Sequence, residues 1–187
     1  YTDKVLFFPM DDFLTSEAIS VSPEFKAERI DTLNKLIKDS NYIVVTNLMG
    51  ILRYLPTVDV WKEHVIQLKK GMVVERDRLV QQLYDMGYER ETIVSETGKL
   101  GVRGYVLDIF PIDFEQPIRI EFWGDEIESI KYFDIDSQIS ADSVENVDIY
   151  PYSEFLLNDK CNDIQKKQKY LKYYSKKIGS LWDFLDG

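Results

Sequence analysis

Hydrophobic and polar residues alternate strictly over residues 117–123, where charged residues separate Ile118, Ile120 and Phe122. A period of two predicts a β-strand that buries one face and leaves the other in solvent. A glycine-led two-residue turn follows, and residues 126–133 are predicted to return as the second strand of a hairpin. This hairpin is the centre of a run of predicted strands around which the rest of the chain is organised.

The register of this hairpin places charged residues on its outer face. With a two-residue turn, Trp123 faces Glu126 and Glu121 faces Glu128. Two carboxylates directly opposite each other repel, and Arg119, one diagonal step away, is expected to offset that repulsion. A Trp beside an Arg on a solvated sheet face has the composition of a protein interface. The alternative is a surface aromatic that lies under long charged side chains.

Upstream of the hairpin, short apolar runs alternate with helical spacings. The predicted elements are a strand at 5–8, a helix that Ser22 caps and Pro23 begins, a strand at 42–46, a helix that Asn47 caps and Pro56 stops, a strand at 65–68, a helix at 75–86 ended by Gly87, and a strand at 91–96. Such an order of strands and helices before residue 69 is typical of an α/β layer with parallel strands. Apolar residues at helical spacing also predict an amphipathic helix from Asp159.

Composition limits the classes of function. The 187 residues are 44% hydrophobic and 30% charged, which is ordinary for a soluble globular protein, and the start at Tyr1 indicates a fragment of a longer protein. No apolar run approaches the roughly 20 residues of a membrane span. Cys161 is the only cysteine, so no disulfide framework is expected and a reducing cytoplasm fits. The net charge of −10 argues against binding of a nucleic-acid backbone by this chain. The Lys-rich stretch 160–177 is interpreted as a solvated face.

Signals for catalysis are weak. A phosphate-binding loop needs G-x-x-x-x-G-K-[ST], and at Gly98-Lys99 the first glycine is replaced by Ile93 and the hydroxyl residue by Leu100. His64 is the only histidine and has no nucleophile with a matching signature, so it is interpreted as a surface residue.

Acidic residues offer one further possibility, a cation site. Carboxylates of the predicted sheet that could hold a hard cation, or act as acid and base, are Asp108, Glu121, Asp125, Glu126 and Glu128. Solvated strands are the favoured interpretation, because the whole chain is acidic. A calcium-loop pattern that begins at Asp134 fails, because Ile139 stands where the sharp turn needs glycine. No catalytic, cofactor or metal site is therefore predicted in this chain.

Three motifs carry a resemblance to known families. GYER, VRGYVLDIFP and PIRIEFWGDEIESIKYFD resemble the inserted domain shared by the excinuclease component UvrB and the transcription-repair-coupling factor. The fold that this resemblance implies is α/β: a partial helicase-like α/β domain at residues 1–68 and 143–187, interrupted at 69–142 by an inserted α+β domain with an antiparallel sheet. In both families the inserted domain docks onto UvrA, another component of the excinuclease.

Two further stretches distinguish the two families. PMDDF with SPEFKAERIDTLNKL, and then YIVVTNLMGILRYLP, resemble the coupling factor. UvrB has a longer segment, with an aromatic hairpin that threads DNA, before its equivalent of residue 42, and that segment has no match here. The coupling factor is therefore favoured, and a fragment of UvrB, which loads onto DNA damage in an ATP-dependent manner, is the alternative.

The resemblance implies a non-catalytic recruitment module that brings UvrA to stalled RNA polymerase. Carried across residue by residue, the docking positions fall on Arg103, Arg119 and Trp123, the last of which is commonly Phe in the family. The longer protein is expected to be a cytoplasmic translocase on double-stranded DNA that uses ATP and magnesium outside this chain. A distant carboxy-terminal domain is expected to mask the UvrA surface until activation, and no membrane partner is expected.

Overall fold

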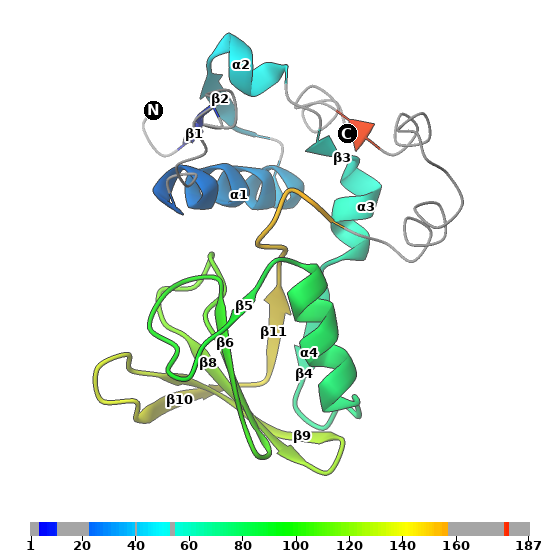
Figure 1. The fold of residues 1–187 in the computed structure, drawn as a ribbon, viewed down its shortest axis with the longest axis vertical. Coiled ribbons are helices and arrows are strands. Elements are labelled where there is room, and N and C mark those ends of the chain that lie inside the picture. Colours follow the sequence, from blue (N-terminus) through cyan, green and yellow to red (C-terminus); the bar gives the residue numbers. More distant parts are fainter. Residues whose placement is uncertain (1–3, 11–22, 40, 53–54, 157–177, 180–187) are drawn as a thin grey trace. The chain divides into compact units, whose positions relative to one another are not determined.

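The computed structural model describes residues 4–10, 23–39, 41–52, 55–156 and 178–179, and Figure 1 gives their fold. The chain forms two compact units, one of residues 1–63 with 154–187 and the other of residues 64–153. The domain bounds predicted at 69 and 142 stay a prediction. No helix among the described residues is both long and apolar enough to cross a membrane.

The first unit contains a parallel strand–helix–strand arrangement. β1 (Val5–Phe8) pairs in parallel with β2 (Ile43–Thr46), and α1 (Pro23–Lys38) lies between them in sequence. The hydroxyl of Thr32 in α1 donates a hydrogen bond of 2.8 Å to the carbonyl of Phe7, which ties the helix to β1. The parallel strands predicted for this part of the chain are therefore confirmed.

Shorter elements complete the described part of this unit. They are α2 (Leu48–Ile51), β3 (Leu55–Pro56), α3 (Val58–Glu63) and β12 (Ile178–Gly179), which pairs antiparallel with β3. The predicted cap is confirmed, because Asn47 Oδ1 accepts a 2.8 Å hydrogen bond from the Gly50 amide. The predicted helix was too long, because Leu55 is buried in a strand, and α3 was not predicted. Ser22 and the amphipathic helix from Asp159 lie outside the described residues.

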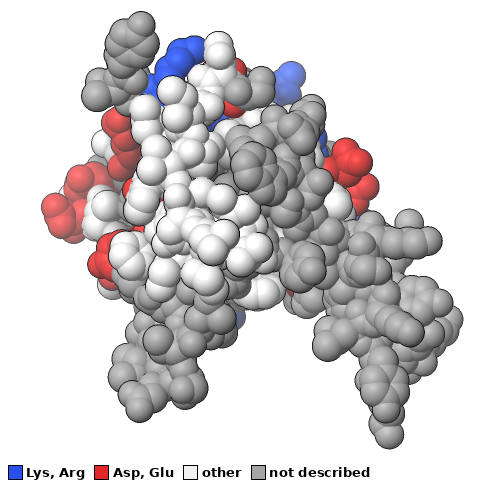
Figure 2. Space-filling view, turned by 90° about the horizontal axis from the view of Figure 1, so that it is seen from above, with Lys and Arg blue, Asp and Glu red and all other residues white. Residues whose placement is uncertain are grey.

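One face of the β1–β2 sheet is apolar and exposed. Val5, Phe7, Ile43 and Val45 share this face and are between 45% and 63% exposed. Phe8 points the other way, where its ring lies under a guanidinium of α1. In the view of Figure 2, the middle of the described surface is largely uncharged, and acidic residues lie toward its sides. Apolar faces of this kind are typical of surfaces that pack against another element or protein.

The second unit contains a six-stranded sheet, helix α4 (Arg76–Asp85) and a pair of strands. The sheet strands are β5 (Glu89–Arg90), β6 (Lys99–Arg103), β7 (Val106–Ile109), β8 (Ile118–Trp123), β9 (Glu126–Phe133) and β10 (Ser140–Val144). Their spatial order is β10-β9-β8-β7-β6-β5, and each neighbouring pair is antiparallel except β5 with β6. The separate pair consists of β4 (Ile66–Lys69) and β11 (Asn146–Ile149), which run antiparallel.

The core of this unit lies on one face of the sheet. Leu79 and Leu83 of α4 are fully buried in the same cluster as Ile118, Ile120 and Phe122 of β8. Each such side chain contributes roughly 1.5–3 kcal/mol by its burial. The alternation predicted from the sequence is confirmed. Because the core covers one face of the sheet, the opposite face is the one available to bind a partner.

The prediction of a strand at residues 91–96 is wrong. Only the two residues of β5 pair with β6 there, and residues 91–98 form a loop. Val94 is buried in a small cluster with Phe110 and Phe133. Val94 therefore anchors a loop rather than a strand.

The β8–β9 hairpin contains a bulge that the sequence prediction missed. Trp123 faces Glu126 as predicted, but the register shifts by one residue, so that Glu121 faces Ser129 rather than Glu128. The extra residue in β9 removes the predicted repulsion between two glutamates, because the carboxylates no longer lie opposite each other. The same shift places Lys131 opposite Arg119.

Candidate protein-binding surface

Three neighbouring strands bring charged side chains together on the outer face of the sheet. β6 supplies Arg103, β7 supplies Asp108 and β8 supplies Arg119, and Asp108 pairs directly with Arg119 in the register. Leu107 and Ile109, which flank Asp108, are buried in the core, so the alternation of the strand turns Asp108 to the outer face. Two of the three predicted docking residues therefore meet at one carboxylate.

Asp108 bonds both arginines. Arg119 holds it bidentately, with Nε 2.7 Å from Oδ1 and Nη2 3.0 Å from Oδ2. Arg103 donates from Nη2 to Oδ2 at 2.5 Å. The three side chains differ in exposure: Asp108 is 2% exposed, Arg119 13% and Arg103 50%. The cluster thus runs from a buried carboxylate to a guanidinium that reaches solvent.

Arg119 is fixed on its remaining edge as well. Its Nη1 donates to the carbonyl of Gln138 at 3.0 Å, and its guanidinium lies 4.6 Å from the centre of the Phe133 ring. Gln138 has a φ of 60°, an uncommon backbone conformation for a residue other than glycine. The hydrogen bond to Asp108 raises the pKa of Arg119 above its ordinary value. Each nitrogen of this guanidinium is therefore engaged inside the protein.

Glu121 is neutralised by its own neighbours on the same face. Its Oε2 accepts hydrogen bonds from Ser129 Oγ at 2.5 Å and from Lys131 Nζ at 2.7 Å. These bonds, the one from Lys131 first, lower the pKa of Glu121 below its ordinary value. The bulge in β9 places Ser129 directly opposite Glu121 and Lys131 one diagonal step away, opposite Arg119.

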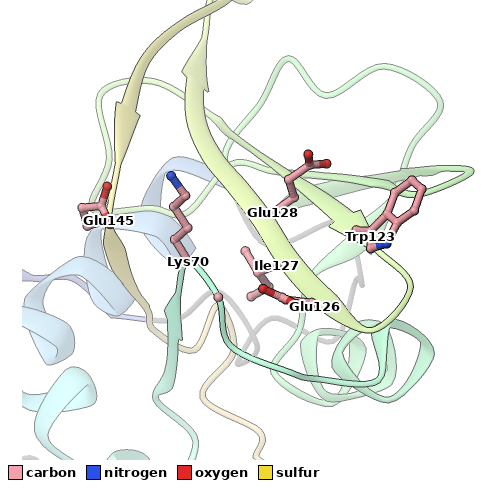
Figure 3. A pocket seen from close by; sticks show the side chains of 7 residues that line it. Lys70, Trp123, Glu126, Ile127, Glu128 and Glu145 are labelled. Atoms are coloured by element: carbon pink, nitrogen blue, oxygen red, sulfur yellow. The ribbon is translucent and has the colours of Figure 1, made fainter.

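Trp123 is the most exposed large hydrophobic residue among those described, at 79%. It lies on the same face of β8 as Arg119, four residues further along the strand, which is about 13 Å. It also borders a groove of about 480 Å³ at the end of the hairpin (Figure 3). The groove is lined by Lys70, Gly71, Trp123, Glu126, Ile127, Glu128 and Glu145. The third predicted docking residue is therefore open to a partner, with carboxylates beside it.

Tyr105 is an exposed aromatic residue that the sequence prediction missed. It stands at the turn between β6 and β7 and is 67% exposed. Its carbonyl accepts a 2.9 Å hydrogen bond from the Phe122 amide, so this turn lies beside the end of β8 that bears Trp123. The signal in the sequence was an aromatic residue directly after Gly104, in a turn between two apolar strands.

Lys99 and Asp134, from the phosphate-loop and calcium-loop patterns that failed, have partners inside the protein. Lys99, next to the glycine of the failed phosphate-loop match, lies 3.0 Å from Glu89 and 3.1 Å from Glu91, which raise its pKa. Asp134 Oδ1 accepts from the amide and hydroxyl of Ser137 at 2.8 and 2.7 Å, and these bonds lower its pKa. Within the described ranges, no three His, Cys, Asp or Glu side chains are grouped so that they could hold a metal ion.

Comparison with known proteins defines the class of this domain. Residues 66–155 match the model of the UvrB interaction domain, so the chain contains a domain of that family. The matched stretch covers the six-stranded sheet together with Arg103, Arg119 and Trp123.

The chain is similar to transcription-repair-coupling factors, as the sequence motifs predicted. It is 37% identical over 153 residues to that of Bacillus subtilis (strain 168), a match that covers 82% of this chain and 13% of the relative. It is 36% identical over 152 residues to that of Staphylococcus aureus (strain bovine RF122 / ET3-1), covering 81% and 13%. With that of Staphylococcus epidermidis (strain ATCC 35984) the identity is 33% over 174 residues, covering 90% and 15%. The chain thus spans between 13% and 15% of the length of these curated relatives.

Proposed function

We propose that this chain is a non-catalytic recruitment module that binds UvrA through the outer face of its six-stranded sheet. Arg103, Arg119 and Trp123 together form the docking surface in this proposal. The observation that carries it is the 79% exposure of Trp123 on the face that also presents the half-exposed Arg103. Tryptophan and arginine are the residue types that most often dominate the free energy of protein association.

Charge on this face also favours a protein partner. Two guanidiniums around Asp108 leave one net positive charge, on a chain whose net charge is −10. A carboxylate on UvrA is the matching group, because a guanidinium can bind it with two parallel hydrogen bonds. The exposed indole of Trp123 would supply apolar area that association removes from water.

For the longer protein we propose the activity of a transcription-repair-coupling factor. It would use ATP and magnesium to translocate on double-stranded DNA and displace stalled RNA polymerase in the cytoplasm, and a carboxy-terminal domain would mask the UvrA surface at rest. The names of the curated relatives support this proposal over a fragment of UvrB. The helicase-like character of residues 1–68 and 143–187 belongs to the same proposal, which the parallel pair β1–β2 supports.

A competition experiment tests the proposal. Purified UvrA is immobilised and the 187-residue chain is passed over it in a surface plasmon resonance measurement, first alone and then with purified UvrB. We expect saturable binding that UvrB competes away, because both would use the same type of domain. Absence of binding at micromolar concentrations, with UvrB binding normally, would overturn the proposal.

A further inference from the structure

Asp108 is a buried charged residue to which the docking proposal gives no role. We propose that Asp108 is the positioning residue of the docking surface: Arg119 locks its carboxylate, and the carboxylate orients the Arg103 guanidinium toward the partner. This inference rests on the proposed function, since it names the residue through which that surface is arranged.

Arg119 locks Asp108 in a single orientation. The two side chains share two hydrogen bonds, of 2.7 and 3.0 Å, across paired positions of β7 and β8. The guanidinium is itself held by the Gln138 carbonyl and by the Phe133 ring. Because the Arg119 guanidinium is bound on two edges and one face, the Asp108 carboxylate that it binds has a single orientation.

The locked carboxylate in turn orients Arg103. A single nitrogen of Arg103, Nη2, bonds Asp108 at 2.5 Å, and the side chain is half exposed. Within the part of the chain that the structure describes, Nε and Nη1 of Arg103 make no hydrogen bond that would occupy them. Arg103 is therefore held at Nη2, and its Nε and Nη1 can donate hydrogen bonds to a partner. Ordering a long side chain before it binds lowers the entropic cost of association.

The charge of Asp108 also holds the two arginines together. Arg103 and Arg119 converge on the same carboxylate, so their like charges lie close together only because Asp108 stands between them. Without that negative charge the two guanidiniums repel, and the exposed one is free to swing away. Removing the charge of Asp108 should therefore act on binding through Arg103.

In this arrangement the two arginines have different roles. Arg119 is a positioning residue whose nitrogens face inward, whereas Arg103 is the residue that meets the partner. Lysine cannot reproduce the bidentate fork of Arg119, but at position 103 it keeps a charge near the surface. We therefore expect Arg119→Lys to weaken UvrA binding about as much as Arg119→Ala, while Arg103→Lys retains part of the affinity.

A double-mutant cycle on UvrA affinity tests the inference. We expect Asp108→Asn to weaken binding by roughly 3- to 100-fold in the wild-type background and by less than about 2-fold in the Arg103→Ala background. A loss of equal size in both backgrounds would overturn the inference, because Asp108 would then act without Arg103. The matched control is Arg78→Ala on the exposed side of α4, which should leave the affinity unchanged.

A second measurement needs no partner and separates the two proposals. NMR relaxation and solvent exchange of the Arg103 Nε–H in the free chain should show an ordered side chain in the wild type and a mobile one in Asp108→Asn. If wild-type Arg103 is already as mobile as Arg78, the positioning role is contradicted even when UvrA binds. If Arg103 is ordered but the wild type does not bind UvrA, the proposed function fails and the positioning of Arg103 stands. Should Asp108→Asn not fold, Arg103→Lys against Arg119→Lys gives the same comparison on affinity.

Discussion

Arg119 and Asp108 form a bidentate ion pair across the adjacent strands β7 and β8, with bonds of 2.7 and 3.0 Å and only 2% of the Asp108 side chain exposed. Taking both charges out of water is costly, and the pair is stable because its remaining donors and acceptors are also bonded. The second acceptor position of Asp108 is used by Arg103. A single buried carboxylate therefore connects the packing of the sheet to the chemistry of its outer face.

Removing this carboxylate should destabilise the fold. Asp108→Ala leaves a buried guanidinium without its counter-ion, and such losses cost about 3–5 kcal/mol. The free energy of unfolding from urea titration measures this. Glu128→Ala, at the exposed bulge residue of the same sheet, is the control and should change stability by no more than about 0.5 kcal/mol. Equal effects from the two substitutions would contradict the structural role given to Asp108.

The indole of Trp123 should matter for binding and not for folding. Trp123→Ala is expected to weaken UvrA binding by about 1–4 kcal/mol, because an exposed aromatic anchor loses its contact area, with nearly unchanged melting temperature. Trp123→Phe keeps an aromatic anchor and should lose much less. Leu48→Ala, at an exposed apolar residue of the other unit, is the matched control for affinity. A large drop in melting temperature for Trp123→Ala would show that the side chain is structural.

Two glycines with positive φ should respond differently to the same substitution. A Cβ at Gly98 would overlap the ring of Tyr152, whereas at Gly124 nothing lies within 4 Å. We expect Gly98→Ala to lose about 2–4 kcal/mol of stability and Gly124→Ala about 1 kcal/mol, since only the first adds a clash to the backbone strain. Thermal and urea unfolding of the two variants measure the difference. Equal losses would mean that the Tyr152 ring does not pack against Gly98.

The pKa of the Glu121 carboxyl should depend on Lys131. Lys131 and Ser129 lower the pKa of Glu121 in the folded chain, so the folded value lies below the unfolded one. The stabilisation from these bonds is therefore present above the ordinary glutamate pKa of about 4.3 and is lost as the pH falls through the folded value. An NMR titration of the Glu121 carboxyl should give a low pKa that rises in Lys131→Met. A titration curve that Lys131→Met leaves in place would contradict this pairing.

Much of the sheet could be predicted because burial imposes a period of two. Ile118, Ile120 and Phe122 have to reach one core, and this requirement fixes the faces of β8. The bulge in β9 was not predicted, because the prediction assumed strict alternation on both sides of the turn. Ile127 and Ile130 are three residues apart and both buried, a spacing that only a bulge places on one face, so the signal was present in the sequence.

The candidate site was predicted less completely than the fold. Arg103, Arg119 and Trp123 came from family motifs, and physical reasoning from the pattern alone left the exposed aromatic ambiguous. Asp108 was considered only as one of several sheet carboxylates. Its bonds to Arg103 and Arg119 join three strands and depend on long-range register, which a local pattern does not encode.

Recruitment of UvrA by the outer sheet face can be measured by calorimetric titration of UvrA with the wild-type chain and with the Arg103→Ala/Trp123→Ala double variant. We expect a saturable heat for the wild type and at least about a 100-fold loss of affinity in the folded double variant. Equal affinities for the two proteins, with melting temperatures unchanged, would contradict it.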